Sequence, residues 1–174
     1  MLRGINVSGQ KKVKMDDLRA LYESLGLQNV ITYIQSGNVI FECRNTNKTE
    51  LKQKIEKSIE EKYEFKVPVE IRTDRELENI LNNSPFGHIE LAEEGTQFLV
   101  TFLSTIPSES KVSEIQHFVA APEQLFICGQ EIYLHCPNGY GKSKLSNSFL
   151  ENKLGIKATT RNWKTVNKLY ELTK

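Results

Sequence analysis

A glycine-containing loop near the C-terminal end carries residue types that bind phosphate. Its sequence, PNGYGKS, spans residues 137–143 and ends in Gly-Lys-Ser, as the phosphate-binding loops of nucleotide hydrolases do. Those loops also need a glycine where this chain has Cys136, and they follow a parallel strand, whereas this loop follows a predicted antiparallel hairpin. Nucleotide hydrolysis is therefore disfavoured. We expect Lys142, Ser143 and Lys144 to contact a phosphate at the N-terminus of the next helix.

A cation and an amide are found where the last predicted helix begins. Thr160 has the side chain of an N-cap, so Arg161 and Asn162 would occupy the first helical turn. The positive end of a helix disfavours a cation, which indicates that Arg161 meets an acid or an anion. Trp163 follows and is better explained as a core residue than as a surface for ligand stacking.

Polar side chains from distant parts of the N-terminal half form a second candidate anion site. They share an expected position, where the end of the first strand and the start of the first helix lie beside the turn of the first hairpin. The group comprises Arg3, Asn6, Lys12, Lys14, Gln35, Ser36 and Asn38. Amide, hydroxyl and ammonium groups beside a helix N-terminus suit an anion. In the structural alternative, the amides fix the turn and Arg3 pairs with a glutamate such as Glu70.

The hairpin that positions this group is predicted from two runs of β-branched and aromatic residues. They flank Ser36 and Gly37, which fit a two-residue turn. That turn pairs Gln35 with Asn38, and the alternation of side chains along a strand then predicts which residues face the core. The predicted core face comprises Thr32, Ile34, Val39, Phe41 and Cys43.

Apolar spacing and capping residues predict the other elements of the first half. Apolar residues recur at helical spacing before Gly26, and Asn47 with Glu50 forms a capping box for a second helix. The expected elements are a strand at 2–7, a helix at 15–25, the hairpin at 30–43, a helix after Asn47 and a strand at 67–72. This β-α-β-β-α-β order is the ferredoxin-like plan.

The second half repeats this order after a short helix capped by Asp74 and a linker. The expected elements are a strand at 97–103, a helix after Ser108, a hairpin around Gly129 and Gln130, a helix at 143–154, a strand at 156–159 and a last helix at 161–172. We therefore predict an α+β fold, a tandem duplication of ferredoxin-like βαββαβ units with antiparallel sheets and an extra C-terminal helix. The predicted domains are residues 1–73 and 97–174, joined by the helix and linker at 74–96.

Each predicted hairpin presents one sheet face that carries rings and few polar groups. In the second hairpin this face holds Phe126, Tyr133 and His135. Cover by another part of the protein would explain such a face. The alternative is a stacking platform for single-stranded nucleic acid.

Composition narrows the class of protein. The 174 residues are 39% hydrophobic, enough for one sizeable core or two small ones. No apolar run approaches the roughly 20 residues of a membrane span and no secretory segment is visible, so we expect a cytoplasmic protein with no membrane contact. Cys43, Cys128 and Cys136 are expected to be buried free thiols. The three histidines have no ligand-like spacing with them, so we expect no metal and no cofactor.

The net charge of +1 conceals an uneven distribution of charge. Residues 74–123 contain nine acidic and two basic residues, whereas residues 142–174 contain eight basic and two acidic residues. Such asymmetry can steer an anionic partner toward the basic part. Mutual neutralisation of the two regions, or exposure of both to solvent, is the alternative.

Several of these stretches together resemble a known family. They are LRGINV at 2–7, KVKM at 12–15, LR at 18–19, YIQSGNV at 33–39, GKSKLSN at 141–147 and TTRNWKTV at 159–166. The chain resembles the bacterial family known as domain of unknown function 1697, and the resemblance spans nearly all of it. It implies two ferredoxin-like α+β units in tandem, with no established activity, cofactor or catalytic residue. The chain departs from the family pattern in a shorter first strand, in Ser8 and in Lys164.

Three functional hypotheses follow. The leading one is non-catalytic binding of a phosphate-bearing partner, nucleic acid or nucleotide, by the basic loops. The second is an enzyme acting on a small polar substrate in a cleft near Arg3, Asn6, Gln35 and Asn38, although none of these side chains is a ready general base. The third is a protein-interaction module that uses the aromatic sheet faces.

Overall fold

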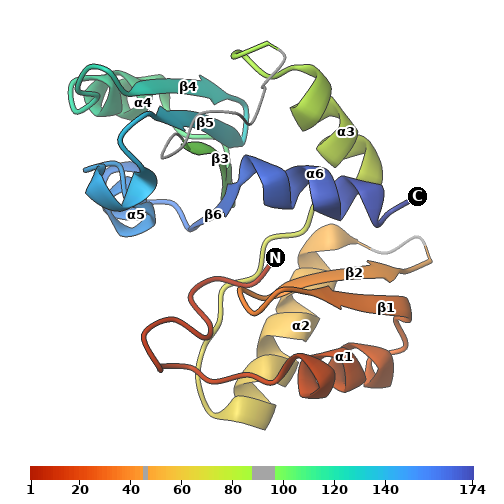
Figure 1. The fold of residues 1–174 in the computed structure, drawn as a ribbon. Coiled ribbons are helices and arrows are strands. Elements are labelled where there is room, and N and C mark those ends of the chain that lie inside the picture. Colours follow the sequence, from red (N-terminus) through yellow and green to blue (C-terminus); the bar gives the residue numbers. More distant parts are fainter. Residues whose placement is uncertain (45–46, 88–96) are drawn as a thin grey trace. The chain divides into compact units, whose positions relative to one another are not determined.

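The structure, a computed structural model, describes residues 1–44, 47–87 and 97–174 (Figure 1). The chain divides into two compact units, residues 1–71 with 172–174, and residues 72–171. The described residues form six α-helices and two antiparallel sheets, so the expected mixture of helices and antiparallel strands is confirmed. The boundaries at residues 73 and 96 stay predictions, and residues 88–96 of the expected linker lie outside the described residues.

The first unit packs two helices against a two-stranded antiparallel sheet. Its elements are α1 (Met15–Ser24), β1 (Gln28–Tyr33), β2 (Asn38–Glu42) and α2 (Lys48–Tyr63). Leu18 and Tyr22 of α1 meet Ile55 and Ile59 of α2 in one core, because each pair is spaced by one helical turn. The Asn47 side chain accepts hydrogen bonds from the first turn of α2, as its capping sequence predicts.

The strand expected at residues 2–7 is wrong, and so is the strand expected at 67–72. Leu2 forms one antiparallel bridge with Val69. This bridge is isolated and does not extend into a ladder between the two stretches. Gly4 and Asn6 have φ of +68° and +56°, which turns the chain away from an extended path. The backbone N–H of Leu2 still donates to the carbonyl of Gly37 at 2.7 Å, so this segment does lie beside the start of β2.

The predicted register of the first hairpin is also wrong. Tyr33 pairs with Asn38 and Thr32 with Val39, so the connection spans residues 34–37 and is longer than a two-residue turn. Ile34 enters this loop with φ of +50° and keeps 47% of its surface exposed, which contradicts its expected core position. Val39 and Phe41 do pack against the core, as predicted.

The second unit is built on a four-stranded antiparallel sheet in the order β4-β5-β3-β6. Its strands are β3 (Gln97–Leu103), β4 (Gln124–Cys128), β5 (Glu131–Cys136) and β6 (Ala158–Asn162). Its helices are α3 (Asp74–Asn82), α4 (Glu109–Gln116), the 3-10 turn η1 (Tyr140–Lys142), α5 (Asn147–Leu154) and α6 (Trp163–Glu171). Cys128 pairs with Glu131, which confirms the two-residue turn expected at Gly129 and Gln130.

Helices cover both faces of this sheet, with α4 and α5 on one side and α3 and α6 on the other (Figure 1). Ile115 of α4 and Leu150 of α5 pack on the face that carries Leu99 and Leu134. On the opposite face, the Tyr133 hydroxyl donates to the carbonyl of Ile80 in α3 at 3.1 Å. Tyr133 therefore belongs to the interior and not to an open aromatic face.

Three expected helix starts are wrong because nearby residues cap or pair better. Helix α5 begins at Asn147 after the N-cap Ser146, so Ser143 lies outside it. Helix α6 begins at Trp163, because residues 158–162 extend β6 along β3. Helix α3 is capped by Thr73, whose hydroxyl and Glu76 form a capping box, and not by Asp74.

Two of the three cysteines contradict their expected burial. Cys43 and Cys128 are exposed, whereas Cys136 is buried and free. Among the described residues, no helix combines the length and apolar character needed to cross a membrane.

Candidate functional site

Asn6 holds together three stretches of the first unit. Its side-chain amide donates to the carbonyls of Val13 and Gln35, each at 2.9 Å. Its side-chain oxygen accepts from the backbone N–H of Val13 at 2.9 Å. The expected contact between Asn6 and the hairpin loop is therefore confirmed. The Asn6 side chain has a structural role, because both its amide nitrogen and its oxygen form internal hydrogen bonds.

Gly37 and Asn38 fix the hairpin loop from inside. Asn38 is fully buried, and its side-chain amide donates to the carbonyl of Tyr33 at 3.1 Å and to the hydroxyl of Ser36 at 3.2 Å. A methyl group on Gly37, whose φ is +79°, would lie 2.6 Å from Cδ1 of Ile5. These contacts support the structural alternative for the amides, and the hypothesis of a small polar substrate gains no support from them.

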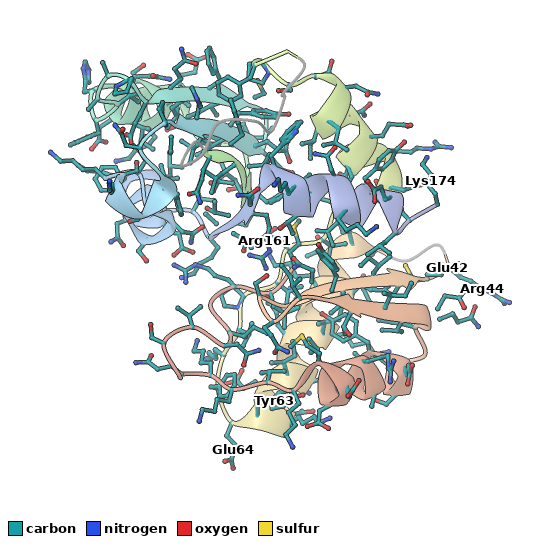
Figure 2. The ribbon with its side chains drawn as sticks, viewed as in Figure 1. Glu42, Arg44, Tyr63, Glu64, Arg161 and Lys174 are labelled. Carbon is teal, nitrogen blue, oxygen red and sulfur yellow. The ribbon has the colours of Figure 1, made fainter. Side chains whose placement is uncertain are left out.

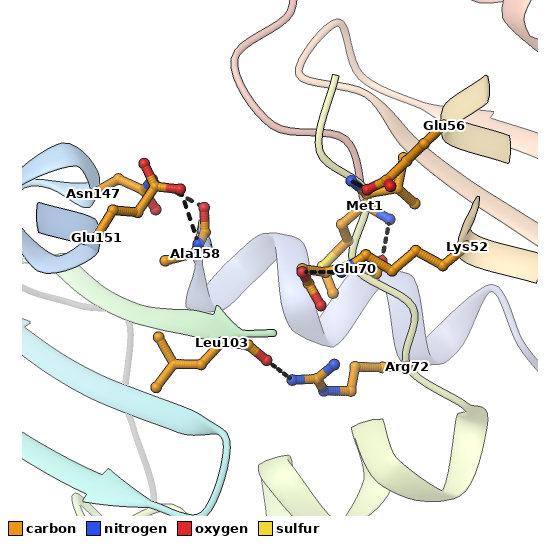
Figure 3. A network of polar contacts seen from close by, with 10 residues as sticks. Met1, Lys52, Glu56, Glu70, Arg72, Leu103, Asn147, Glu151 and Ala158 are labelled. Carbon is orange, nitrogen blue, oxygen red and sulfur yellow. Dashed lines mark hydrogen bonds and ion pairs between the residues drawn. The ribbon is translucent and has the colours of Figure 1, made fainter. Parts of the chain in front are cut away.

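The N-terminus is tied to residues 68–70 by hydrogen bonds to and from the backbone (Figure 3). The N-terminal ammonium of Met1 donates to the carbonyl of Glu70 at 2.8 Å, and the backbone N–H of half-buried Arg3 donates to Pro68 at 2.9 Å. The Glu70 carboxylate, only 4% exposed, forms an ion pair with Lys52 at 2.8 Å. An acid expected near Arg3 is thus paired with a lysine from α2.

The three lysines of the segment before α1 differ in the contacts that they make. The Lys11 ammonium donates to the carbonyl of Lys66 at 2.7 Å and lies 5.8 Å from the centre of the Phe65 ring. Lys12 and Lys14 are exposed, and Lys14 immediately precedes α1. The latter two therefore keep the exposure that an anion contact requires.

The loop at residues 137–144 is closed by its own hydrogen bonds. The backbone N–H groups of Lys142 and Ser143 donate to the carbonyls of Gly139 and Tyr140, both at 3.1 Å. The Ser143 hydroxyl accepts from the backbone N–H of Leu145 at 3.0 Å. A phosphate cradle of backbone amides at a helix N-terminus is therefore not what this loop forms. Contact through the exposed side chains of Lys142 and Lys144 stays a prediction.

Asn147 and Thr160 join the two C-terminal stretches of the family resemblance. The hydroxyl of Thr160 donates to the side-chain oxygen of Asn147 at 2.8 Å and lies 2.8 Å from the hydroxyl of buried Thr101. The Asn147 amide donates to the carbonyl of Ala158 at 3.0 Å. This chain of bonds ties α5 to β6 and β3, so these polar residues are structural.

Arg161 lies in β6 opposite Val100 and is only 9% exposed. Its guanidinium donates to the carbonyl of Thr160 at 2.9 Å. Burial lowers the pKa of Arg161 to about 10, because desolvation disfavours the charged form. The side chain of Asn162 accepts from the backbone N–H of Lys164 at 3.0 Å, so Asn162 supports the start of α6.

Sheet register brings most of the C-terminal candidates to one end of the second unit. Gln97 pairs with Cys136, and Leu99 pairs with Asn162, so the loop after β5 and the start of α6 lie at the same end. The side chain of Gln97 accepts from the backbone N–H of Tyr140 at 2.7 Å, which fixes this loop against β3. The loop residues Lys142 and Lys144 and the α6 residue Lys164 are exposed there.

Four rings gather at the same end of the sheet. The Phe98 and His135 rings stack with centroids 4.4 Å apart and planes 6° apart. Phe86 meets Phe98 at 5.2 Å and Phe126 at 5.4 Å, and Phe126 is 43% exposed. Sequence reasoning missed Phe86 and Phe98. The alternation of Phe98, Val100 and Phe102 in one strand is a signal that places Phe98 on the ring-bearing face.

The first unit also has an open cavity of about 550 Å³. Its charged lining comes from Glu42, Arg44, Glu50 and Lys54, and Leu25, Leu27 and Leu51 also line it. Glu42, the last residue of β2, and Arg44, two residues later, are labelled in Figure 2. The Lys54 ammonium donates to the carbonyl of Leu25 at 3.0 Å. In residues 1–44, 47–87 and 97–174, no three His, Cys, Asp or Glu side chains are grouped so that they could hold a metal ion.

Comparison with known proteins assigns a family and no activity. No curated protein matches the chain. A solved structure, titled "The structure of conserved bacterial protein SP0830 from Streptococcus pneumoniae", is similar with a TM-score of 0.76 and 25% sequence identity. The match covers 100% of this chain and 96% of that one. The family model described as "Protein of unknown function (DUF1697)" matches residues 1–133, and the chain therefore belongs to this family, as its sequence motifs predict.

Proposed function

We propose that this protein binds a phosphate-bearing partner, a nucleic acid or nucleotide, without converting it chemically. The observation that carries the proposal is the position of Lys142 and Lys144, both exposed on a loop that Tyr140 fixes to the end of an antiparallel sheet. Exposed ammonium groups on an ordered loop attract phosphates and release their counterions on binding. The polar groups near Asn6 and Asn147 are engaged in internal bonds and are assigned no ligand role.

The fold supports this assignment. We infer that the second unit is a ferredoxin-like βαββαβ module, since β3, α4, β4, β5, α5 and β6 follow that order and the sheet order is β4-β5-β3-β6. The first unit is then a reduced copy, in which the contacts of Leu2 with Gly37 and Val69 replace two full strands. Four-stranded sheets of this plan are a common scaffold for single-stranded nucleic acid.

A binding assay with a fluorescent single-stranded 12-nucleotide DNA tests the proposal. We expect measurable affinity at about 50 mM salt and a steep loss at about 200 mM, because binding releases counterions from the phosphates. The double variant Lys142→Gln/Lys144→Gln should weaken binding and reduce the slope of log K against log salt by about 1.4, or about 0.7 for each lost phosphate contact.

Lys157→Gln is the matched control. Lys157 is exposed like the two loop lysines, but it precedes Ala158 at the opposite end of β6. Its removal changes the net charge as much as either single variant, Lys142→Gln or Lys144→Gln, without touching the proposed site. Absence of binding at about 50 mM salt refutes the proposal. If the control loses as much affinity for the DNA as each single loop-lysine variant does, the assignment of the binding site to the loop is refuted.

A further inference from the structure

We propose that Phe86, Phe98, Phe126 and His135, hereafter the ring cluster, stack the bases of single-stranded nucleic acid. The inference rests on the proposed function and adds the part of the partner that is recognised. Phosphates bear charge but no ring, so the loop lysines alone would accept any polyanion. Stacking on the ring cluster would instead require unpaired bases.

Sheet register places three of the rings on one face of three adjacent strands. Phe98 of β3 pairs with His135 of β5, and His135 pairs with Gln124 of β4. Phe126, two residues further along β4, points to the same face as His135 because side chains alternate along a strand. Phe86, which follows α3, contacts all three of the other rings at centroid distances of 5.2 to 5.8 Å.

Among the residues that the structure describes, the ring cluster is the part of this face that the helices leave open. Val100, Phe102 and Tyr133 on the same face are 0%, 0% and 3% exposed, because α3 and α6 cover them. Phe126 keeps 43% of its surface exposed, while Phe98 and His135 are half-buried. An aromatic ring held by contact with neighbouring rings is a rigid surface on which a base can stack at low entropic cost.

The neighbourhood of the ring cluster suits a strand that also carries phosphates. Phe98 follows Gln97, whose side chain holds the loop that bears Lys142 and Lys144. His135 precedes Cys136, the last residue of β5 before this loop. Rings and cations therefore lie at the same end of one sheet, with the rings on one face and the loop packed against the other. A strand that passes over this end would combine base stacking with phosphate contact.

The test compares two fluorescent probes with equal numbers of phosphates, a 12-nucleotide oligothymidine and a 12-unit abasic strand. The wild-type protein should bind oligothymidine more tightly than the abasic strand. Phe126→Leu keeps an apolar side chain but removes the ring, and it should weaken oligothymidine binding by about fivefold or more. Its affinity for the abasic strand should change less than about twofold, since that strand offers no base to stack.

Two further variants keep the result interpretable. Phe126→Trp restores an aromatic surface and should retain or raise the affinity for oligothymidine. Phe118→Leu removes a half-buried ring of the same unit that packs on Phe149 at 5.1 Å, and it should leave both affinities unchanged. Circular dichroism of each variant confirms that the fold is intact.

The outcomes separate this inference from the proposed function. Unchanged oligothymidine binding by Phe126→Leu overturns stacking, while the lysine variants still test phosphate contact. Equal loss for both probes, or loss in a folded Phe126→Trp, also overturns stacking. Failure of the wild-type protein to bind either probe overturns both statements.

Discussion

The ion pair between Arg72 and Glu131 provides the sharpest test of how the second unit is held together. The guanidinium Nε of Arg72 donates to Glu131 at 2.9 Å, and its Nη2 donates to the carbonyl of Leu103 at 2.9 Å. The guanidinium carbon of Arg72 lies 5.6 Å from the centre of the Phe102 ring. Figure 3 shows the bond to Leu103. Arg72→Met keeps much of the apolar stem and removes the charge and the donors.

The expected loss of stability follows from burial. The side chains of Arg72 and Glu131 are 5% and 16% exposed, so the variant leaves a largely buried carboxylate without this partner. Breaking a buried ion pair costs about 3–5 kcal/mol, and the residual exposure of Glu131 favours the lower end, about 3 kcal/mol. With an m-value of about 1–3 kcal/mol/M, the urea midpoint should fall by about 1–3 M.

Trp163 makes the measurement specific to the second unit. It is the single tryptophan of the chain, lies at the start of α6 and is 7% exposed, so its fluorescence reports the unfolding of that unit. Lys168→Met is the matched control. Its exposed ion pair with Glu171 should contribute only about 0.3–0.5 kcal/mol.

A double-mutant cycle decides between loss of the pair and loss of packing. Replacing both partners, as Arg72→Met/Glu131→Gln, removes the buried charge and should recover a substantial part of the stability. A loss for Arg72→Met no larger than that of Lys168→Met would refute the reasoning. So would a double variant less stable than the single one.

Three further predictions concern the core and its thiol. Gly37→Ala should destabilise the first unit by about 2–3 kcal/mol, because the added Cβ would overlap side chains. Urea unfolding followed by circular dichroism measures this loss. The control Gly26→Ala, which has a similarly positive φ but open space around it, should cost about 1 kcal/mol. Asn147→Ala should destabilise the second unit by about 1–3 kcal/mol, since it deprives the Thr160 hydroxyl of its acceptor, and unchanged tryptophan-monitored unfolding would contradict this. Burial raises the pKa of Cys136 to about 11. At pH 8 a thiol reagent should therefore modify the two exposed cysteines quickly and Cys136 slowly. The difference between these reaction rates should narrow as the pH rises toward 11. Equal rates of modification for all three thiols would refute the burial of Cys136.

Local signals were sufficient where an element is determined by its own residues. Helix α1 follows from apolar spacing before Gly26, and α2 from the Asn47 cap. The hairpin of β4 and β5 follows from the turn at Gly129 and Gln130. In each case the contacts that decide the structure lie within a few residues of one another in sequence.

Local signals failed where contacts distant in sequence decide the backbone. The positive φ of Asn6 accompanies side-chain bonds to residues 13 and 35, which no local pattern reveals. Thr160 has the side chain of a helix cap, but pairing with Thr101 keeps it in a strand and delays α6 to Trp163. The same pairing moves Arg161 from an expected helix start into the interior of a sheet.

Asn6, Asn147 and Thr160, three polar residues within the family motifs, have a structural role. Asn6 joins the stretches at 2–7, 12–15 and 33–39, and Asn147 with Thr160 joins those at 141–147 and 159–166. Resemblance in these stretches therefore points to the fold, because their side chains form bonds that build it in this chain. A ligand can be contacted only by groups that the internal bonds leave exposed. In the second unit these include the loop lysines and the ring cluster, so substitutions there test the proposed binding while leaving the internal bonds in place.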